Sequence, residues 1–221
     1  MVVLATKLYV EGDARERALD SLRSQVDNDV GDLDVEYDVG VRHDDFPTVT
    51  LEGPDEVAAR NVLAETWGEI TDGFEAGETY VGTLESWDDD GFVLDAGEDV
   101  VVPADELGLG PGTPAQIRER FGLVQHVPLR FTYGETPALA DEERDRLYDW
   151  TRGSGRLNVN SATRGEVRAT VNRAGHAQDI VTVERLGLLE QSIVCREGTD
   201  PPGLLAAIGE YLPSELLAVV P

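Results

Sequence analysis

The sequence is poor in the residues that build disulfide frameworks and metal centres. Its 221 residues include one cysteine, Cys195, and three histidines that lie far apart, His43, His126 and His176. A single cysteine excludes an intrachain disulfide and every thiolate-rich zinc or iron–sulfur site. One unpaired thiol is also typical of a reducing compartment. We therefore expect a cytoplasmic protein that needs no metal and no other cofactor.

Segments that mark membrane proteins and several enzyme classes are also missing. No apolar run approaches the roughly 20 residues needed to span a bilayer, and no basic region precedes the apolar amino end. The chain has one lysine, Lys7, which excludes a G-x-x-x-x-G-K-[ST] phosphate loop, and it contains no H-E-x-x-H or G-x-S-x-G motif. We therefore expect a protein that is not an enzyme and has no membrane partner.

Positive charge is scarce, because 44 acidic residues face 18 basic ones and the formal net charge is −26. All the basic residues except Lys7 are arginine, and this combination resembles proteins of salt-accumulating archaea. In about 1 M salt the Debye length falls to about 3 Å. Net charge therefore does not exclude nucleic acid as a partner. Binding would depend on stacking, bidentate hydrogen bonds and shape, which suit arginine.

The order of predicted elements indicates a mixed α+β protein in several parts. Residues 1–74 predict the order βαββα, with strands near 2–10, 33–41 and 47–51 and helices that begin near Asp13 and Asp55. Asp13 with Glu16 three residues later is a signal for a helix start. We expect a ferredoxin-like α/β sandwich in this amino-terminal domain.

Residues 75–135 change to short strands, with a capping box of Thr113 and Gln116 before the last of them. The segments Tyr80-Val81-Gly82-Thr83-Leu84, Gly91-Phe92-Val93 and Val100-Val101-Val102-Pro103 resemble the OB fold, specifically the module repeated in the large ribosomal protein S-one. The resemblance implies a central OB-like β-barrel in which Tyr80 and Phe92 stack on bases. The alternative is that one or both rings lie in the barrel core.

Residues 136–155 predict a linker helix followed by a flexible Gly-Ser-Gly loop. Residues 156–221 predict the order βαββαβ, with a capping box of Thr163 and Glu166 and with Pro201 at the start of the second helix. This order is that of a C-terminal ferredoxin-like domain, whose two helices cover one face of the sheet and leave the other face free.

Three further segments, residues 116–126, 160–164 and 195–203, carry a resemblance that runs over the whole length of the chain. They resemble an archaeal family, domain-of-unknown-function family 2110. The resemblance implies an archaeal origin and a three-part layout. It brings no activity, so function has to be inferred from the residues.

The carboxyl-terminal part carries an island of positive charge. Between Arg152 and His176 there are five arginines and one acid, Glu166. Arg164, Arg168 and Asn172 recur every four residues and should form a ridge on one helix face, which could contact successive phosphates. The alternative is a solvated helix face that pairs with acids elsewhere in the protein.

The nine residues that we predict to bind RNA combine this island with the two aromatic residues of the barrel. Arg152 and Arg156 would extend the ridge from the loop before the helix. His176 either contacts a phosphate or base, or ends the helix together with Gly175. The full set is Arg152, Arg156, Arg164, Arg168, Asn172, Arg173, His176, Phe92 and Tyr80.

We interpret the sequence as a non-enzymatic RNA-binding accessory protein of archaeal translation, RNA processing or ribosome maturation, with structured RNA or a ribonucleoprotein as partner. One alternative is a protein-interaction module of the transcription or ribosomal machinery that uses open sheet faces. Another is an amino-acid-binding regulator, because residues 200–208 resemble the strand-to-helix turn of ACT domains. A simpler interpretation of those residues is a capped helix.

Overall fold

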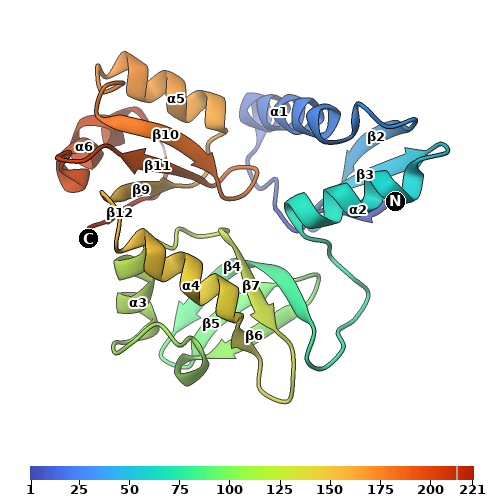
Figure 1. Ribbon diagram of the computed structural model, residues 1–221, viewed down its shortest axis with the longest axis horizontal. Helices are drawn as coiled ribbons and strands as arrows, with labels where there is room; N and C mark the ends of the chain where they lie inside the picture. Colours follow the sequence, from blue (N-terminus) through green and yellow to red (C-terminus); the bar gives the residue numbers. More distant parts are fainter. Residues whose placement is uncertain (213) are drawn as a thin grey trace.

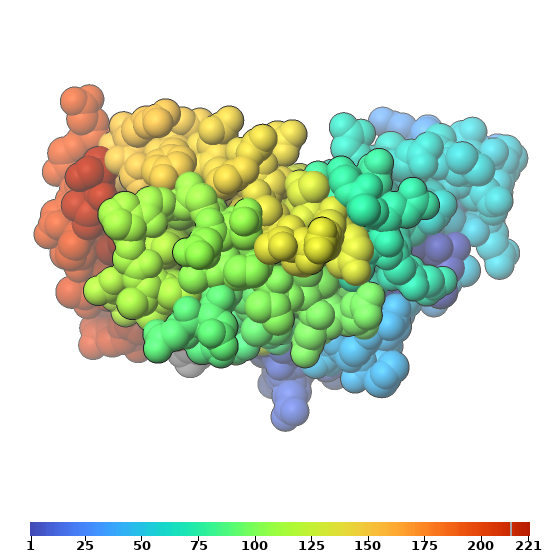
Figure 2. Space-filling model, turned by 90° about the horizontal axis from the view of Figure 1, so that it is seen from below, coloured from blue at the N-terminus to red at the C-terminus, as the bar shows by residue number. Residues whose placement is uncertain are grey.

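The computed structural model describes residues 1–212 and 214–221 and contains three antiparallel sheets, each with its own helices (Figure 1). The predicted mixed α+β class is confirmed. In Figure 1 the amino-terminal and carboxyl-terminal parts lie side by side, and the central part lies below both. Figure 2, seen from below, shows the green central part spread between the orange carboxyl-terminal part and the cyan amino-terminal part.

None of the described helices combines the length and apolar character that crossing a membrane requires.

The amino-terminal part has the predicted order βαββα. Its elements are β1 (Val2–Val3), α1 (Gly12–Val30), β2 (Glu36–Val41), β3 (Pro47–Glu52) and α2 (Glu56–Trp67). The sheet order is β1–β3–β2, and the two helices pack on the face that carries the buried Val39 and Val49. Helix α1 begins at Gly12, one residue from the predicted start, but Asp13 does not cap it, because the N-cap is Glu11 and makes no side-chain cap bond.

The first strand is much shorter than the predicted range 2–10. After Val3 only Leu4 continues the pairing, as an isolated bridge to Glu69. Residues 5–7 leave the sheet and are buried against the other parts, where the Thr6 hydroxyl accepts a hydrogen bond from the backbone N–H of Leu188 at 2.8 Å. Contacts with sequence-distant residues therefore override the local strand preference here.

The central part is a curled sheet with helices at its open side. Its elements are β4 (Thr79–Asp88), β5 (Gly91–Asp95), β6 (Asp99–Pro103), the 3-10 helix η1 (Ala104–Glu106), α3 (Pro114–Phe121), β7 (Pro128–Thr132), β8 (Ala138–Leu139) and α4 (Asp141–Trp150). The sheet order is β6–β5–β4–β7–β8, and the outer strands β6 and β8 contact each other, so the sheet forms a half-barrel. The predicted capping box is present: Thr113 Oγ1 accepts from Gln116 N at 3.3 Å, and Gln116 Oε1 accepts from Thr113 N at 3.0 Å.

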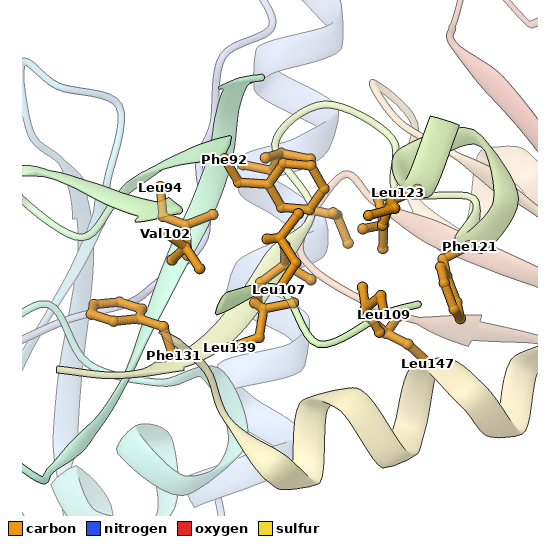
Figure 3. Packing of buried hydrophobic residues seen from close by; sticks show 14 of the residues in the cluster. Phe92, Leu94, Val102, Leu107, Leu109, Phe121, Leu123, Phe131, Leu139 and Leu147 are labelled. Carbon is orange, nitrogen blue, oxygen red and sulfur yellow. The ribbon is translucent and has the colours of Figure 1, made fainter. Parts of the chain in front are cut away.

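The half-barrel closes around an apolar core to which α4 contributes. Figure 3 shows Phe92, Val102 and Phe131 from the strands together with Leu147 from α4. Leu147 is fully buried and Trp150 is 5% exposed. The helix that we predicted as a linker therefore packs on the half-barrel and fills part of its core.

The carboxyl-terminal part has the predicted order βαββαβ. Its elements are β9 (Arg156–Val159), α5 (Arg164–Arg173), β10 (Ile180–Arg185), β11 (Gln191–Cys195), α6 (Pro201–Ile208), the 3-10 helix η2 (Gly209–Tyr211) and β12 (Leu216–Val219). The sheet order is β10–β11–β9–β12. The core between the sheet and the two helices includes Val167 and Val171 from α5 and Leu204 and Ile208 from α6.

The other face of this sheet is not free, so that prediction is wrong. The Asn158 side chain donates to the carbonyl oxygen of Gly122, just after α3, at 2.8 Å. Val219 of β12 is buried in the core of the central part. Arg118 of α3 also pairs with Glu215. The central part therefore covers this face.

Candidate nucleic-acid interface

Helix α5 carries the predicted ridge, and its first residue is fixed by the predicted capping box. Thr163 Oγ1 accepts a hydrogen bond from Glu166 N at 3.4 Å, while Glu166 Oε2 accepts one from Thr163 N at 2.8 Å. Glu166 also pairs with Arg17 of α1 at 2.8 Å. Burial alone would raise the pKa of Glu166, but the hydrogen bonds from Thr163 and Arg17 lower it. The one acid of the basic island is therefore ionised and already engaged.

The helix periodicity places the ridge on the solvent side, as predicted. Val167 and Val171 are fully buried against the sheet, while Arg164, Arg168 and Asn172 are exposed. Arg168 and Asn172 line a hollow of about 300 Å³ beside β10, the edge strand of the sheet. Arg196, which follows β11, lines the same hollow. The sheet thus brings together residues that are distant in the sequence.

Arg164 lies at a second depression, a groove of about 500 Å³ between the carboxyl-terminal part and α1. Arg185, at the end of β10, also lines this groove. Its Nη1 donates to Gln25 Oε1 at 2.9 Å, and its guanidinium carbon lies 3.7 Å from the ring centre of Trp67. Burial lowers the pKa of Arg185, Asp29 opposes this effect, and the positive charge of Arg164 lowers the pKa further.

Five arginines of the carboxyl-terminal part have no carboxylate partner among the described residues. In contrast, the arginines of the amino-terminal and central parts are paired with acids within 4.0 Å, except Arg120, which donates to the carbonyl oxygens of Leu109 and Pro111. The five are Arg164, Arg168, Arg173, Arg185 and Arg196. Four of them, Arg164, Arg168, Arg185 and Arg196, line the two depressions, so in a chain with 44 acids this surface offers donors to an anion.

The loop arginines do not extend the ridge. Arg152 pairs with Asp149 at 3.5 Å. Arg156 pairs with Glu184 at 3.0 Å and stacks on the ring of Trp150, with 4.9 Å between its guanidinium carbon and the ring centre. The prediction for Arg156 is wrong, because this residue joins the sheet to α4 inside the molecule.

His176 ends the helix with Gly175, which was the second interpretation. Gly175 has φ +81°, and its N–H donates to the carbonyl oxygen of Asn172, while the N–H of His176 donates to that of Val171. This is the hydrogen-bond pattern of a Schellman cap. His176 Nδ1 also lies 2.6 Å from Asp179 Oδ2. Arg173 lies away from the ridge, at a hollow that it shares with Arg17 and Tyr211.

The two barrel aromatics offer little to a base. Phe92 is fully buried in the core of the half-barrel (Figure 3), so its predicted stacking role is wrong. Tyr80 is half-buried, its hydroxyl accepts a hydrogen bond from Glu75 N at 2.8 Å, and its ring lies 4.8 Å from that of Phe74. In the sequence the short strand could not show which of its faces points inward.

Arg185 and Arg196 were missed by the sequence analysis. They lie outside the basic island of residues 152–176, at the two ends of the β10–β11 hairpin. Only the antiparallel pairing of Ile180–Arg185 with Gln191–Cys195 brings them beside α5. The sequence contained no local signal for this, because strand pairing determines their position.

A second polar cluster lies where the three parts meet, and it contains the only lysine. Lys7 Nζ is 2.6 Å from Asp95 Oδ2 and 3.0 Å from Glu85 Oε1. Glu85 also lies 3.2 Å from His126 Nδ1. Burial alone would raise the pKa of Glu85, but hydrogen bonds from His126, Thr83 and Lys7 lower it to about 2.

Tyr9 links this cluster to the carboxyl-terminal part. Its ring centre is 4.0 Å from that of His126, and its hydroxyl donates to Glu190 Oε1 at 2.7 Å and accepts from Ser161 N at 2.9 Å. Glu190 is fully buried, its Oε2 has no partner among the described residues, and burial raises its pKa to about 8. Among residues 1–212 and 214–221, no group of three or more His, Cys, Asp or Glu is arranged to hold a metal ion.

Comparison with known proteins covers almost the whole chain through three family models. The DUF2110 N-terminal domain matches residues 1–73, the DUF2110 central domain matches residues 74–151, and the DUF2110 C-terminal domain matches residues 154–220. The central match includes α4. A comparison with curated proteins found no match.

Proposed function

The chain belongs to the DUF2110 family, and we propose that it is a non-enzymatic RNA-binding accessory protein whose contact surface is formed by α5 and the edge strand β10. The observation that carries the proposal is the set of arginines on this surface that have no carboxylate partner among the described residues. Arg164, Arg168, Arg185 and Arg196 line the two depressions there.

Physical chemistry favours a polyanion for this surface. Elsewhere among the described residues the arginines pair with nearby acids, apart from Arg120 and Arg173, since 44 acids are available. Guanidinium groups that keep their N–H donors free can bind phosphate oxygens in a planar, bidentate way. Such contacts depend on direct geometry and less on long-range attraction, which suits binding in molar salt.

The fold is consistent with this proposal. The order β10–β11–β9–β12, with both helices on one face, supports a ferredoxin-like carboxyl-terminal domain, and the order β1–β3–β2 supports a related amino-terminal sandwich. The curled central sheet supports an OB-like barrel. The single lysine and the net charge of −26 support salt adaptation, and the proposal extends to a cytoplasmic role in archaeal translation, RNA processing or ribosome maturation.

The proposal is tested by RNA binding of the full chain in molar KCl. Filter binding of cellular RNA should weaken by about tenfold or more in the Arg168→Gln/Arg196→Gln variant, which corresponds to a loss of at least about 1.4 kcal/mol. The matched control is Arg23→Gln/Arg60→Gln, which removes the same charge from paired, exposed arginines of α1 and α2. Equal binding by both variants, or no binding by the wild type, would contradict the proposal.

A protein partner is the second candidate, and the open edge of β10 is the observation that favours it. Within the described part of the chain β10 pairs with β11 on one side only, and Val181 is 63% exposed. An extended peptide could add to such an edge. Crosslinking followed by nuclease treatment discriminates the two candidates, because recovery of protein partners without any RNA would favour this one.

The amino-acid-binding regulator is the third candidate, and it depends on the turn at Asp200. In the structure this turn forms the expected cap, since Asp200 Oδ2 accepts from Gly203 N at 3.1 Å. A thermal-shift screen in which no amino acid changes the unfolding temperature would remove this candidate.

A further inference from the structure

We propose that the groove between α1 and the α5–β10 edge is a site for a phosphate group, held by Arg164 and Arg185. This inference deepens the proposed function and rests on it for RNA as the carrier of the phosphate. Arg164 approaches from the first turn of α5, and Arg185 from the end of β10. The opposite wall is α1, with Ser21, Gln25 and Asn28.

The two guanidinium groups repel each other, and neither forms a salt bridge within 4.0 Å among the described residues. Both arginines line the groove, and the charge of Arg164 lowers the pKa of Arg185, as expected for two like charges close to each other. Asp29, the one acid among the described residues that line the groove, offsets part of this charge, and its Oδ2 accepts a hydrogen bond from Trp67 Nε1 at 3.0 Å. Bringing two like charges together costs free energy, and a bound dianion would recover it.

The one acid of α5, Glu166, is also engaged. Glu166 bonds to Thr163 at the helix start and to Arg17 of α1. It therefore does not neutralise the groove. This separates the site from an ordinary salt-bridged surface, where each arginine has its own carboxylate partner.

The remaining lining suits a phosphate. The Asn28 amide and the Ser21 hydroxyl add neutral donors opposite the arginines. The volume of about 500 Å³ is that of a site for a ligand of nucleotide size.

Arg185 is positioned before any ligand binds. Its guanidinium carbon lies 3.7 Å from the ring centre of Trp67, and its Nη1 donates to Gln25 Oε1. Little side-chain entropy is therefore lost on binding. Because the walls come from both end parts of the chain, a bound phosphate would also tie α1 to α5.

The test uses the full chain and titration calorimetry with four probes: sodium phosphate, AMP, and one oligoribonucleotide with and without a 5′-phosphate. Arg164→Gln should weaken binding of sodium phosphate or AMP about tenfold. Asn28→Asp should do the same without altering either arginine, because it places a carboxylate in the groove from the α1 side. Arg60→Gln is the control, since it removes one charge from an exposed, paired residue outside the groove.

The outcomes separate the groove from the proposed function. The site is supported if the probes bind saturably to the wild type and the control, and both groove variants lose this binding. The probe with the highest affinity then identifies whether the carrier is an RNA end, an internal phosphodiester or a free nucleotide. If wild type binds phosphate and AMP but no RNA, the groove stands and the RNA function fails. If RNA binding depends on Arg168 and Arg196 while the groove variants bind every probe like wild type, the groove is refuted and the RNA function stands. Absence of saturable binding for all four probes refutes the groove.

Discussion

Replacing Glu190 with glutamine should remove a large part of the pH dependence of folding. Glu190 is fully buried at the junction of the three parts, with Oε1 bonded to Tyr9 and Oε2 without a partner among the described residues. Its pKa is raised from 4.5 to about 8, first by burial and also by the nearby charge of Glu85. The folded protein therefore holds a proton on Glu190 at neutral pH.

The direction follows from proton linkage. Below about pH 4.5 the carboxyl is protonated in both the folded and the unfolded state, so it adds no pH dependence. Between pH 4.5 and about 8 only the unfolded state loses the proton, so the stability falls as the pH rises, by up to about 1.4 kcal/mol per pH unit. Over the full shift of about 3.5 units this amounts to about 5 kcal/mol.

Urea unfolding followed by tryptophan fluorescence from pH 5 to pH 9 measures this effect. Glu190→Gln should match the wild type to within about 1 kcal/mol near pH 5 and exceed it by several kcal/mol near pH 9. Glu65→Gln, on the exposed side of α2, is the control and should follow the wild type at every pH. A constant difference between Glu190→Gln and the wild type across this range would refute the reasoning.

Two further predictions concern the same junction. Lys7→Met should destabilise the fold by about 2 kcal/mol or more in urea unfolding, because it leaves Glu85 and Asp95 close together without their shared cation, and Lys7→Arg should retain part of the stability. If Lys7→Met unfolds at the wild-type urea concentration, the pair is not important for stability. The contribution of Glu85 should be complete above about pH 4.5 and disappear as the pH falls towards 2, since its pKa is lowered in the folded state. His126→Gln should reduce this acid sensitivity, and an unchanged acid unfolding midpoint would contradict it.

Helix periodicity and caps were predictable because they depend on neighbours in the sequence. The capping boxes at Thr113 and Thr163 form as expected, and Val167 and Val171 face the core. The start of α1 was not predictable from Asp13, because Asp13 is not the residue that precedes the helix. Local patterns therefore located helices better than they located helix ends.

The candidate interface was predicted only in part. The ridge of Arg164, Arg168 and Asn172 follows from helical spacing, and the structure leaves it exposed. Arg156 could not be separated from this ridge by sequence, since its partners Glu184 and Trp150 come from another strand and another part of the chain. The prediction that Phe92 stacks on a base was wrong for a similar reason, because the curl of the sheet determines which face is inside.

The mixed α+β class, the order of the elements and the excess of arginine near α5 were predictable, because they follow from local periodicity and composition. Which arginines have no acidic partner among the described residues, and which are used inside the molecule, depends on how the three parts pack together. This packing also places the single lysine, Lys7, at the junction of all three parts. The reason is that burial and charge pairing depend on residues that are close in space and far apart in the chain.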